Sequence, residues 1–222
     1  MIQTTIIPKV FKLIVYFIGL NILSLGTVFF TVCHLGASPL VSLPLAISTI
    51  LPITLGQSTT SLFAFFVLVQ IILKKNFEWK IISQFIVAFL FGNIVDFYNT
   101  TIGLKHLVLT FIAFKIIVLL LANILTAIGV VTMIRANFIL NPPDGLVNVI
   151  SEKTGNSFGR TKVFFDLIMI LSTLALSILF VGNISIIGIG TLVAVILVGN
   201  LVSFCNKVFK RYVPIKSDNK SN

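Results

Sequence analysis

The fold is decided by residues 13–73, which read LIVYFIGLNILSLGTVFFTVCHLGASPLVSLPLAISTILPITLGQSTTSLFAFFVLVQIIL. This run of 61 residues contains no Asp, Glu, Lys or Arg. A helix that spans a bilayer needs about 20 mostly apolar residues, so the run can hold two spans and the segment that joins them. Two further charge-free runs cover residues 116–134 and 167–206. The sequence therefore predicts an all-α integral membrane protein.

The composition excludes a soluble domain. The chain has 222 residues, of which 57% are hydrophobic and only 10% charged, and its mean hydropathy is +1.13. Too few charged side chains are present to cover a water-facing surface, so the surface is expected to face the lipid bilayer. The net charge of +10 would suit nucleic acid in a soluble protein. Here the basic residues gather beside apolar spans, as the positive-inside rule requires, and no nucleic acid is expected.

We expect six transmembrane helices and two short helices that do not span. The six spans are predicted at residues 11–33, 57–73, 80–98, 109–134, 161–181 and 184–206. Segment 38–52 is apolar but contains three prolines, which break it into short pieces. Segment 142–154 contains two acids, a lysine and an asparagine, which makes a lipid-facing span too costly. Whether these two segments are re-entrant or interfacial stays open.

The basic residues predict the orientation. With six crossings and the N-terminus in the cytoplasm, only Lys105 and Lys115 fall toward the outside. The other 14 of the 16 basic residues are cytoplasmic: Lys9, Lys12, Lys74, Lys75, Lys80, Arg135, Lys153, Arg160, Lys162, Lys207, Lys210, Arg211, Lys216 and Lys220. A full crossing by segment 38–52 would move Lys74 and Lys75 to the far side. Both termini are therefore expected in the cytoplasm.

The two halves of the chain repeat weakly. Residues 76–93 align without a gap on residues 183–200, which pairs Gly92 with Gly199 and Asn93 with Asn200. Further upstream a shift of 103 pairs Gly26 with Gly129, Ser38–Pro39 with Asn141–Pro142, and Gly56 with Gly159. Three crossings per half is an odd number, so the halves are expected to be inverted relative to each other, as in many transporters. This predicts a cytoplasmic N-terminus (1–10), a first membrane repeat (11–98), an external loop (99–108), a second repeat (109–206) and a basic cytoplasmic tail (207–222).

The second half also resembles a known family. The stretches that carry the resemblance are residues 129–135, Asn-Pro-Pro-Asp-Gly-Leu at 141–146, Gly-Asn-Ser-Phe-Gly at 155–159, and Ile-Gly-Ile-Gly-Thr at 187–191 with Gly199. They resemble the bacterial YczE-like membrane proteins, which are related to the YyaS/YitT group of uncharacterised multi-pass proteins. The resemblance covers most of the chain. It implies a multi-pass protein of a bacterial inner or plasma membrane and lends no mechanism.

The start of segment 142–154 is the strongest candidate site. Asn141 suits the N-cap, Pro142 the first helical position, Asp144 the third, and Gly155 the C-terminal stop. Capping alone could explain these residues, with Asp144 favoured by the helix dipole. In the functional interpretation, unpaired N–H groups face a solute, and Asp144 binds a proton or a cation or pairs with Arg135.

The predicted substrate or ion site also includes Asn148 on the same segment and Ser38 at the matching start of segment 38–52. The first half lacks the acid, because Val41 stands at the position of Asp144. Any site is therefore expected to be chemically asymmetric.

Asn93 and Asn200, each after a glycine, are predicted to pack helices together by close contact and interhelical hydrogen bonds, or to form a polar lining. Lys162 and Asp166 are predicted to form an i,i+4 ion pair at the cytoplasmic edge of the fifth span. Asp96 is predicted to be an interfacial residue at the outer end of the third span.

Enzyme chemistry is not expected. No Ser/His/Asp set or carboxylate pair is visible, His34 and His106 have no metal-ligand spacing, and Cys33 and Cys205 are expected at opposite ends of their spans. No cofactor or metal is predicted.

The leading hypothesis is a secondary transporter or exporter of a small-molecule solute that works by alternating access. The alternative is a non-catalytic membrane module, either a solute-binding subunit or a scaffold that needs a partner. Assembly as a homo-oligomer or with a membrane partner stays open.

Overall fold

The computed structural model describes residues 9–182 and 186–212, and every regular element within them is helical. Six helical segments are long and apolar enough to cross a membrane, which confirms the predicted number. They are Val10–Val32, Leu55–Lys74, Trp79–Thr101, Ile112–Ala136, Phe158–Val181 and Ile189–Val208. The predicted start of the sixth span at residue 184 lies outside the described residues, as do residues 1–8 of the N-terminus and 213–222 of the tail.

Each span consists of one helix or of consecutive helical pieces. The first, second and fourth spans are α1 (Lys9–Val32), α3 (Leu55–Lys74) and α6 (Ile112–Ala136). The third consists of α4 (Trp79–Ile82), α5 (Gln84–Asp96) and η1 (Phe97–Thr101), and η2 (Leu104–His106) follows in the connecting loop. The fifth consists of α8 (Phe158–Leu176) and η3 (Ser177–Val181), and the sixth is α9 (Ile189–Tyr212). The helix α9 thus continues into the predicted basic tail.

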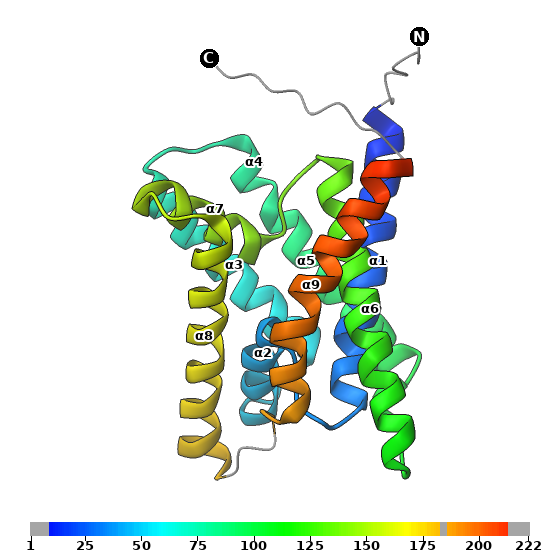
Figure 1. Cartoon of the computed structure of the whole chain (residues 1–222). Coiled ribbons are helices and arrows are strands. Elements are labelled where there is room, and N and C mark those ends of the chain that lie inside the picture. Colours follow the sequence, from blue (N-terminus) through cyan, green and yellow to red (C-terminus); the bar gives the residue numbers. More distant parts are fainter. Residues whose placement is uncertain (1–8, 183–185, 213–222) are drawn as a thin grey trace.

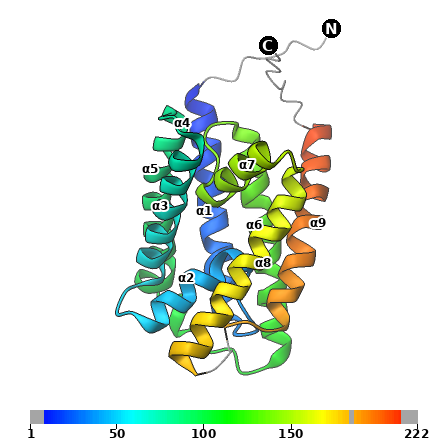
Figure 2. The same ribbon diagram turned by 90° about the vertical axis from the view of Figure 1, so that its left-hand side faces the viewer.

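Two short helices, α2 (Pro39–Ile50) and α7 (Pro142–Thr154), occupy the segments whose placement hydropathy left open. They have 12 and 13 residues. At 1.5 Å per residue each is about 20 Å long, too short for a hydrocarbon core of about 30 Å. The helix α7 lies at the end of the bundle where α1 begins and α9 ends, which we call the terminal end, whereas α2 lies at the opposite end (Figures 1 and 2).

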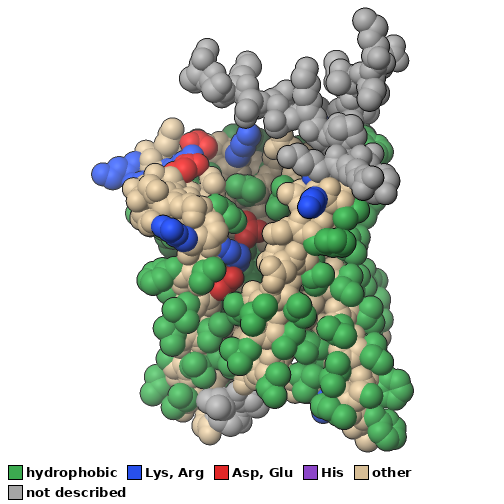
Figure 3. Space-filling model, viewed as in Figure 1, with side chains coloured by type: hydrophobic (Ala, Val, Ile, Leu, Met, Phe, Trp, Pro, Cys, Tyr) green, Lys and Arg blue, Asp and Glu red, His purple; other side chains and the backbone are tan. Residues whose placement is uncertain are grey.

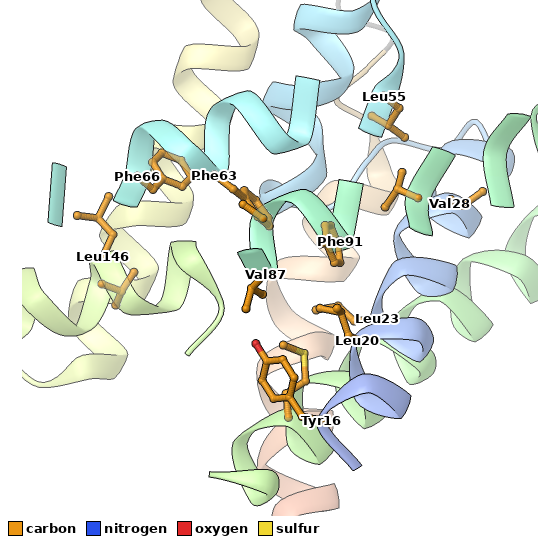
Figure 4. Packing of buried hydrophobic residues seen from close by; sticks show 14 of the residues in the cluster. Tyr16, Leu20, Leu23, Val28, Leu55, Phe63, Phe66, Val87, Phe91 and Leu146 are labelled. Atoms are coloured by element: carbon orange, nitrogen blue, oxygen red, sulfur yellow. The ribbon is translucent and has the colours of Figure 1, made fainter. Parts of the chain in front are cut away.

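Close helix crossings organise the centre of the bundle. The helices α1 and α6 meet at glycines: a Cβ added at Gly26 would lie 2.8 Å from the Thr126 side chain, and one added at Gly129 would lie 2.6 Å from the Leu23 backbone nitrogen. Such contacts are typical of membrane helices that pack through small residues. Around this crossing, buried side chains of α1, α3, α5, α6, α7 and α8 form the largest apolar cluster, which Figure 4 shows in part.

The fifth and sixth spans are the least buried of the six. The helix α8 packs against α2 and α7, and α9 packs mainly against α6. Within the described residues, α8 and α9 share no extensive contact, although their counterparts α3 and α5 pack closely together. A cleft therefore separates α8 from α9 on the face shown in Figure 3.

Candidate functional site

The first turn of α7 forms as predicted, but it offers few free N–H groups. Asn141 occupies the N-cap position with Pro142 next, and Gly155 ends the helix in the left-handed region with φ 68°. The Asn141 side chain makes no capping hydrogen bond. Two of the first N–H groups do not exist, because residues 142 and 143 are both proline, and Gly145 donates its N–H to the Asn141 carbonyl. The expectation of several unpaired N–H groups here is wrong, and the prolines are the reason.

Three charged side chains meet beside this turn, and we call them the charged cluster: Asp144 of α7 with Lys162 and Asp166 of α8. The Lys162 ammonium lies 2.9 Å from an Asp166 carboxylate oxygen, which confirms the predicted i,i+4 pair, and 3.8 Å from a carboxylate oxygen of Asp144. Their side chains are 22%, 29% and 20% exposed for Asp144, Lys162 and Asp166. Figure 3 shows acidic and basic side chains inside the cleft, on a face that is otherwise largely apolar.

The environment of Asp144 favours its protonated form. Burial raises the pKa of the Asp144 carboxyl above the usual range, and the charge of Asp166 acts in the same direction. The ammonium of Lys162 opposes this shift but does not cancel it. Lys162 is closer to Asp166 than to Asp144, so Asp144 is the less neutralised of the two acids. It is therefore the carboxylate of the cluster better suited to take up a proton or another cation.

Among the described residues, the predicted alternative in which Asp144 pairs with Arg135 is wrong. Arg135, near the end of α6, donates from Nε to the Asn206 side chain at 2.9 Å and from a terminal nitrogen to the Asn206 carbonyl at 2.7 Å. It thereby links α6 to α9, and Lys162 supplies the positive charge beside Asp144 instead.

Two other residues of the predicted substrate or ion site lie apart from the charged cluster. Asn148 donates to Glu152 one turn later on α7, at 2.7 Å, in a hydrogen bond exposed at the surface. Ser38 is buried at the N-cap of α2, and its carbonyl accepts hydrogen bonds from Val41 and Ser42. Because α2 lies at the far end of the bundle from α7, Ser38 marks a separate polar position.

A buried glutamine pair adjoins the first turn of α7, and it was not identified in the sequence. Gln70 of α3 donates to Gln84 of α5 at 2.8 Å and accepts from it at 3.1 Å, and Gln70 also donates to the Pro142 carbonyl at 3.1 Å. A Cβ added at Gly145 would lie 2.6–2.8 Å from these two amide groups. The only sign of this pair in the sequence was a glutamine in each of two otherwise apolar spans.

Two further polar atoms in this region are buried without a hydrogen-bond partner among the described residues. They are Oδ1 of Asn141 and the hydroxyl of Tyr16. Asn141 is 6% exposed and Tyr16 is 2% exposed. Figure 4 shows the Tyr16 hydroxyl directed away from α1 and toward Val87 of α5. An unsatisfied buried polar group costs about 1–3 kcal/mol, so the interior near α7 holds hydrogen-bonding capacity that the described part of the chain does not use.

Among the described residues, the two repeat-equivalent asparagines make hydrogen bonds only within their own helices. Asn93 donates to the Phe89 carbonyl at 2.7 Å and Asn200 to the Ile196 carbonyl at 2.9 Å, each within its own helix, and both are exposed. The expected interhelical hydrogen bonds are therefore not formed by these amides. The preceding glycines differ from each other: Gly92 lies at the crossing of α3 and α5, whereas no described atom lies within 4 Å of a Cβ added at Gly199.

Asp96 has a structural role that its predicted interfacial position did not suggest. Its carboxylate accepts a hydrogen bond from the Gly56 N–H at 2.8 Å and another from the Thr54 hydroxyl. Thr54 is the N-cap of α3, where it also forms a capping box with Gln57. Asp96 therefore ties the start of α3 to the end of α5, and the helix dipole of α3 favours its charge.

Comparisons with known proteins agree with the predicted resemblance. A family model described as "Family of unknown function (DUF6198)" matches residues 10–207. The chain is 28% identical over 205 residues to "Uncharacterized protein YyaS" of Bacillus subtilis (strain 168), which covers 90% of this chain and 95% of that protein. No solved structure matches.

Proposed function

This chain belongs to the DUF6198 family of unknown function, and we propose that it is a secondary transporter that moves a small cationic solute by alternating access. The observation that carries the proposal is the charged cluster formed by α7 and α8, together with the acidic and basic side chains seen inside the cleft of Figure 3. Charged side chains within a membrane protein are costly, and they commonly mark the path of an ion or a substrate.

The charges of the cluster support a cationic solute exchanged for a proton. Asp144 and Asp166 against Lys162 leave a net charge of −1 when both acids are ionised. One bound proton or one monovalent organic cation neutralises the cluster. Because the two compete for the same charge, the cluster releases one when it takes up the other, and this competition is the thermodynamic basis of exchange. Because the pKa of Asp144 is raised, protonation of its carboxyl competes with cation binding at a pH closer to neutral.

Contacts between the two halves support an inverted repeat. Gly26 packs on Thr126 and Gly129 packs on Leu23, and a shift of 103 residues turns the first contact into the second with the partners exchanged. Such reciprocal contacts are those expected of two units related by a two-fold axis. Inverted repeats and short, broken helices are common in secondary transporters, in which the solute binds where the repeats meet.

A second reciprocal contact involves the short helices. The Thr173 hydroxyl of α8 donates to Ser42 of α2 at 3.0 Å, and at the equivalent positions Gln70 of α3 packs on Gly145 of α7. Each short helix thus packs on the span of the other half. This arrangement supports a transport cycle in which one half moves against the other.

The distribution of basic residues supports a cytoplasmic position of the terminal end. In this proposal the charged cluster lies toward the cytoplasm, because α7 lies at the terminal end, while Gly56, Gly92 and Asp96 close the outer ends of α3 and α5. This corresponds to an inward-facing state of a protein of the bacterial plasma or inner membrane.

The low burial of α8 and α9 favours a second candidate function. In that case the chain is a solute-binding subunit, and a membrane partner covers these two spans and supplies energy. Binding of the solute would then occur without flux in the isolated chain.

Reconstitution of the purified chain tests the proposal. Liposomes that contain the pH dye pyranine are exposed to choline, spermidine and tetraphenylphosphonium as cations, and to glutamate as an anion. At least one cation is expected to drive a pH change across liposomes with the wild-type chain but not with Asp144→Asn. The control is Glu152→Gln, which removes an exposed acid from the same helix and is expected to transport normally. Equal responses of wild type and Asp144→Asn to every probe refute the proposal.

A further inference from the structure

The crossing of α3 and α5 is a backbone contact between two glycines. A Cβ added at Gly56 would lie 2.1 Å from the Gly92 carbonyl oxygen, and one added at Gly92 would lie 2.0 Å from the Thr60 side chain and 2.4 Å from the Gly56 carbonyl oxygen. No other residue allows helices to approach this closely. Asp96 ties the same ends together through the N–H of Gly56. We call this arrangement the closed crossing.

The second half contains the corresponding residues, but they do not form a closed crossing. Gly159 of α8 and Gly199 of α9 match Gly56 and Gly92, yet no described atom lies within 4 Å of a Cβ added at either position. Ser203, the equivalent of Asp96, donates to the Gly199 carbonyl of its own helix at 2.9 Å. Ser157, the equivalent of Thr54, is the N-cap of α8 but makes no side-chain cap hydrogen bond.

The present conformation does not explain these glycines. Glycine in a helix loses more conformational freedom on folding than alanine does, and this cost is normally offset by a close approach or an unusual backbone angle. Gly159 and Gly199 make no close approach to the described residues, and their φ angles are not positive. A conformation in which α8 and α9 approach as α3 and α5 do would give both glycines a packing role.

We propose that α8 and α9 close on each other through Gly159 and Gly199, and that this movement covers the charged cluster. The cleft of Figure 3 lies between these helices, so their approach removes the cluster from its open side. Burying an uncompensated charge is costly, so closure is favoured when a proton or a bound cation has neutralised Asp144. Closure of the two helices stands on the packing alone, whereas its meaning as a transport step rests on the proposed function.

Cysteine cross-linking in membranes tests the closure, and the chain supplies its own controls. In the full chain with Cys33→Ser and Cys205→Ser, the test pair is V163C/V195C, whose positions are equivalent to Thr60 and Ala88. The positive control is T60C/A88C, which lies at the crossing where α3 and α5 are already in contact and the Thr60 hydroxyl is 3.3 Å from the Ala88 carbonyl oxygen. The negative control is F164C/V195C, which turns one thiol to the next face of α8. Positions 163, 164 and 195 are exposed, so these substitutions leave the packing intact.

The readout is the number of thiols that a polyethylene-glycol maleimide labels after mild oxidation and unfolding in sodium dodecyl sulfate, which exposes buried thiols such as that at position 88. Helix motions on the microsecond-to-millisecond scale revisit a closed state many times during oxidation, so we expect about tenfold more cross-linking in V163C/V195C than in F164C/V195C. At the same pH, adding Asp144→Asn is expected to raise cross-linking of the test pair, because it neutralises this acid. Equal labelling of the test pair and the negative control, while T60C/A88C is cross-linked, overturns the closure.

A bulky substitution gives an independent measure. Gly199→Leu is expected to fold with normal yield, because the position is open, and to reduce V163C/V195C cross-linking to the level of the negative control. Cross-linking that is unaffected by this leucine contradicts a contact through Gly199. If the helices cross-link as expected but the liposomes show no cation-driven pH change, the closure stands and the transport function fails. If the liposomes exchange cations but the helices do not cross-link, the transport function stands and the closure fails.

Discussion

Alanine substitutions at the two equivalent glycines of α5 and α9 should affect stability in opposite directions. At Gly92 an added Cβ would lie 2.0 Å from the Thr60 side chain and 2.4 Å from the Gly56 carbonyl oxygen. The threonine can rotate, but the backbone of α3 cannot move without opening its crossing with α5. Overpacking of this kind costs about 1–3 kcal/mol, and sometimes more. At Gly199 no described atom lies within 4 Å, so alanine is expected to stabilise α9 by about 0.5–1 kcal/mol.

The two variants should therefore differ by roughly 1.5–4 kcal/mol in the free energy of unfolding, the sum of the two effects. For a chain of this size 1 kcal/mol corresponds to about 2–4 °C in Tm, so the melting temperatures should differ by about 3–16 °C. Circular dichroism of the purified variants in one detergent, with reversible titration into a denaturing detergent, measures both quantities. A Gly92→Ala variant that is as stable as Gly199→Ala would refute the close α3–α5 crossing and the asymmetry derived from it.

Three further predictions concern polar contacts. Asp96→Asn should lower the unfolding free energy by about 1–2 kcal/mol in the same titration, because a charged acceptor of the Gly56 N–H is lost; an unchanged midpoint argues against this cap. Gln70→Leu should destabilise by about 1–3 kcal/mol because Gln84 is left unsatisfied, whereas Gln70→Leu with Gln84→Leu should recover part of the loss; strict additivity of the two single substitutions contradicts this coupling. The raised pKa of Asp144 means that folding stabilises its protonated form, so the stability of wild type relative to Asp144→Asn should fall as pH rises above about 4, through the raised pKa. A difference that is constant with pH rules out the raised pKa.

The sequence was sufficient for the membrane class and the number of spans, because both depend on long charge-free runs and on the thickness of the bilayer. It could not decide whether residues 38–52 are re-entrant or interfacial, since an apolar segment too short to cross fits either placement. Their placement follows from packing against α8 and α3, which lie elsewhere in the sequence. Local signals were reliable at both ends of α7, where Pro142 and Gly155 act on the backbone directly.

Which residues form the site depends on contacts between segments distant in the sequence, and the sequence was less informative about such contacts. Asp144 was identified because it is the acid in the first turn of a short helix whose capping residues are visible in the sequence. Its partner was not, because Arg135 is closer in sequence but lies at the end of α6 against Asn206, whereas Lys162 projects from α8. Gln70 and Gln84 were missed for the same reason, since a single amide in a span gives no indication of what it faces.

The glutamine pair suggests how a single site could face both sides of the membrane in the proposed cycle. The helices α3 and α5 are joined at one end by Gly56 and Gly92 and near the other by Gln70 and Gln84. The amide pair makes directional hydrogen bonds and rests on Gly145, so it is the natural pivot if the glycine contact opens. In the proposed cycle, separation of the outer ends about this pivot would open the bundle beside Gly145, the residue that follows Asp144. The charged cluster borders the same turn of α7 from the side of α8, so both halves of the proposed cycle would act on one fixed site, as alternating access requires.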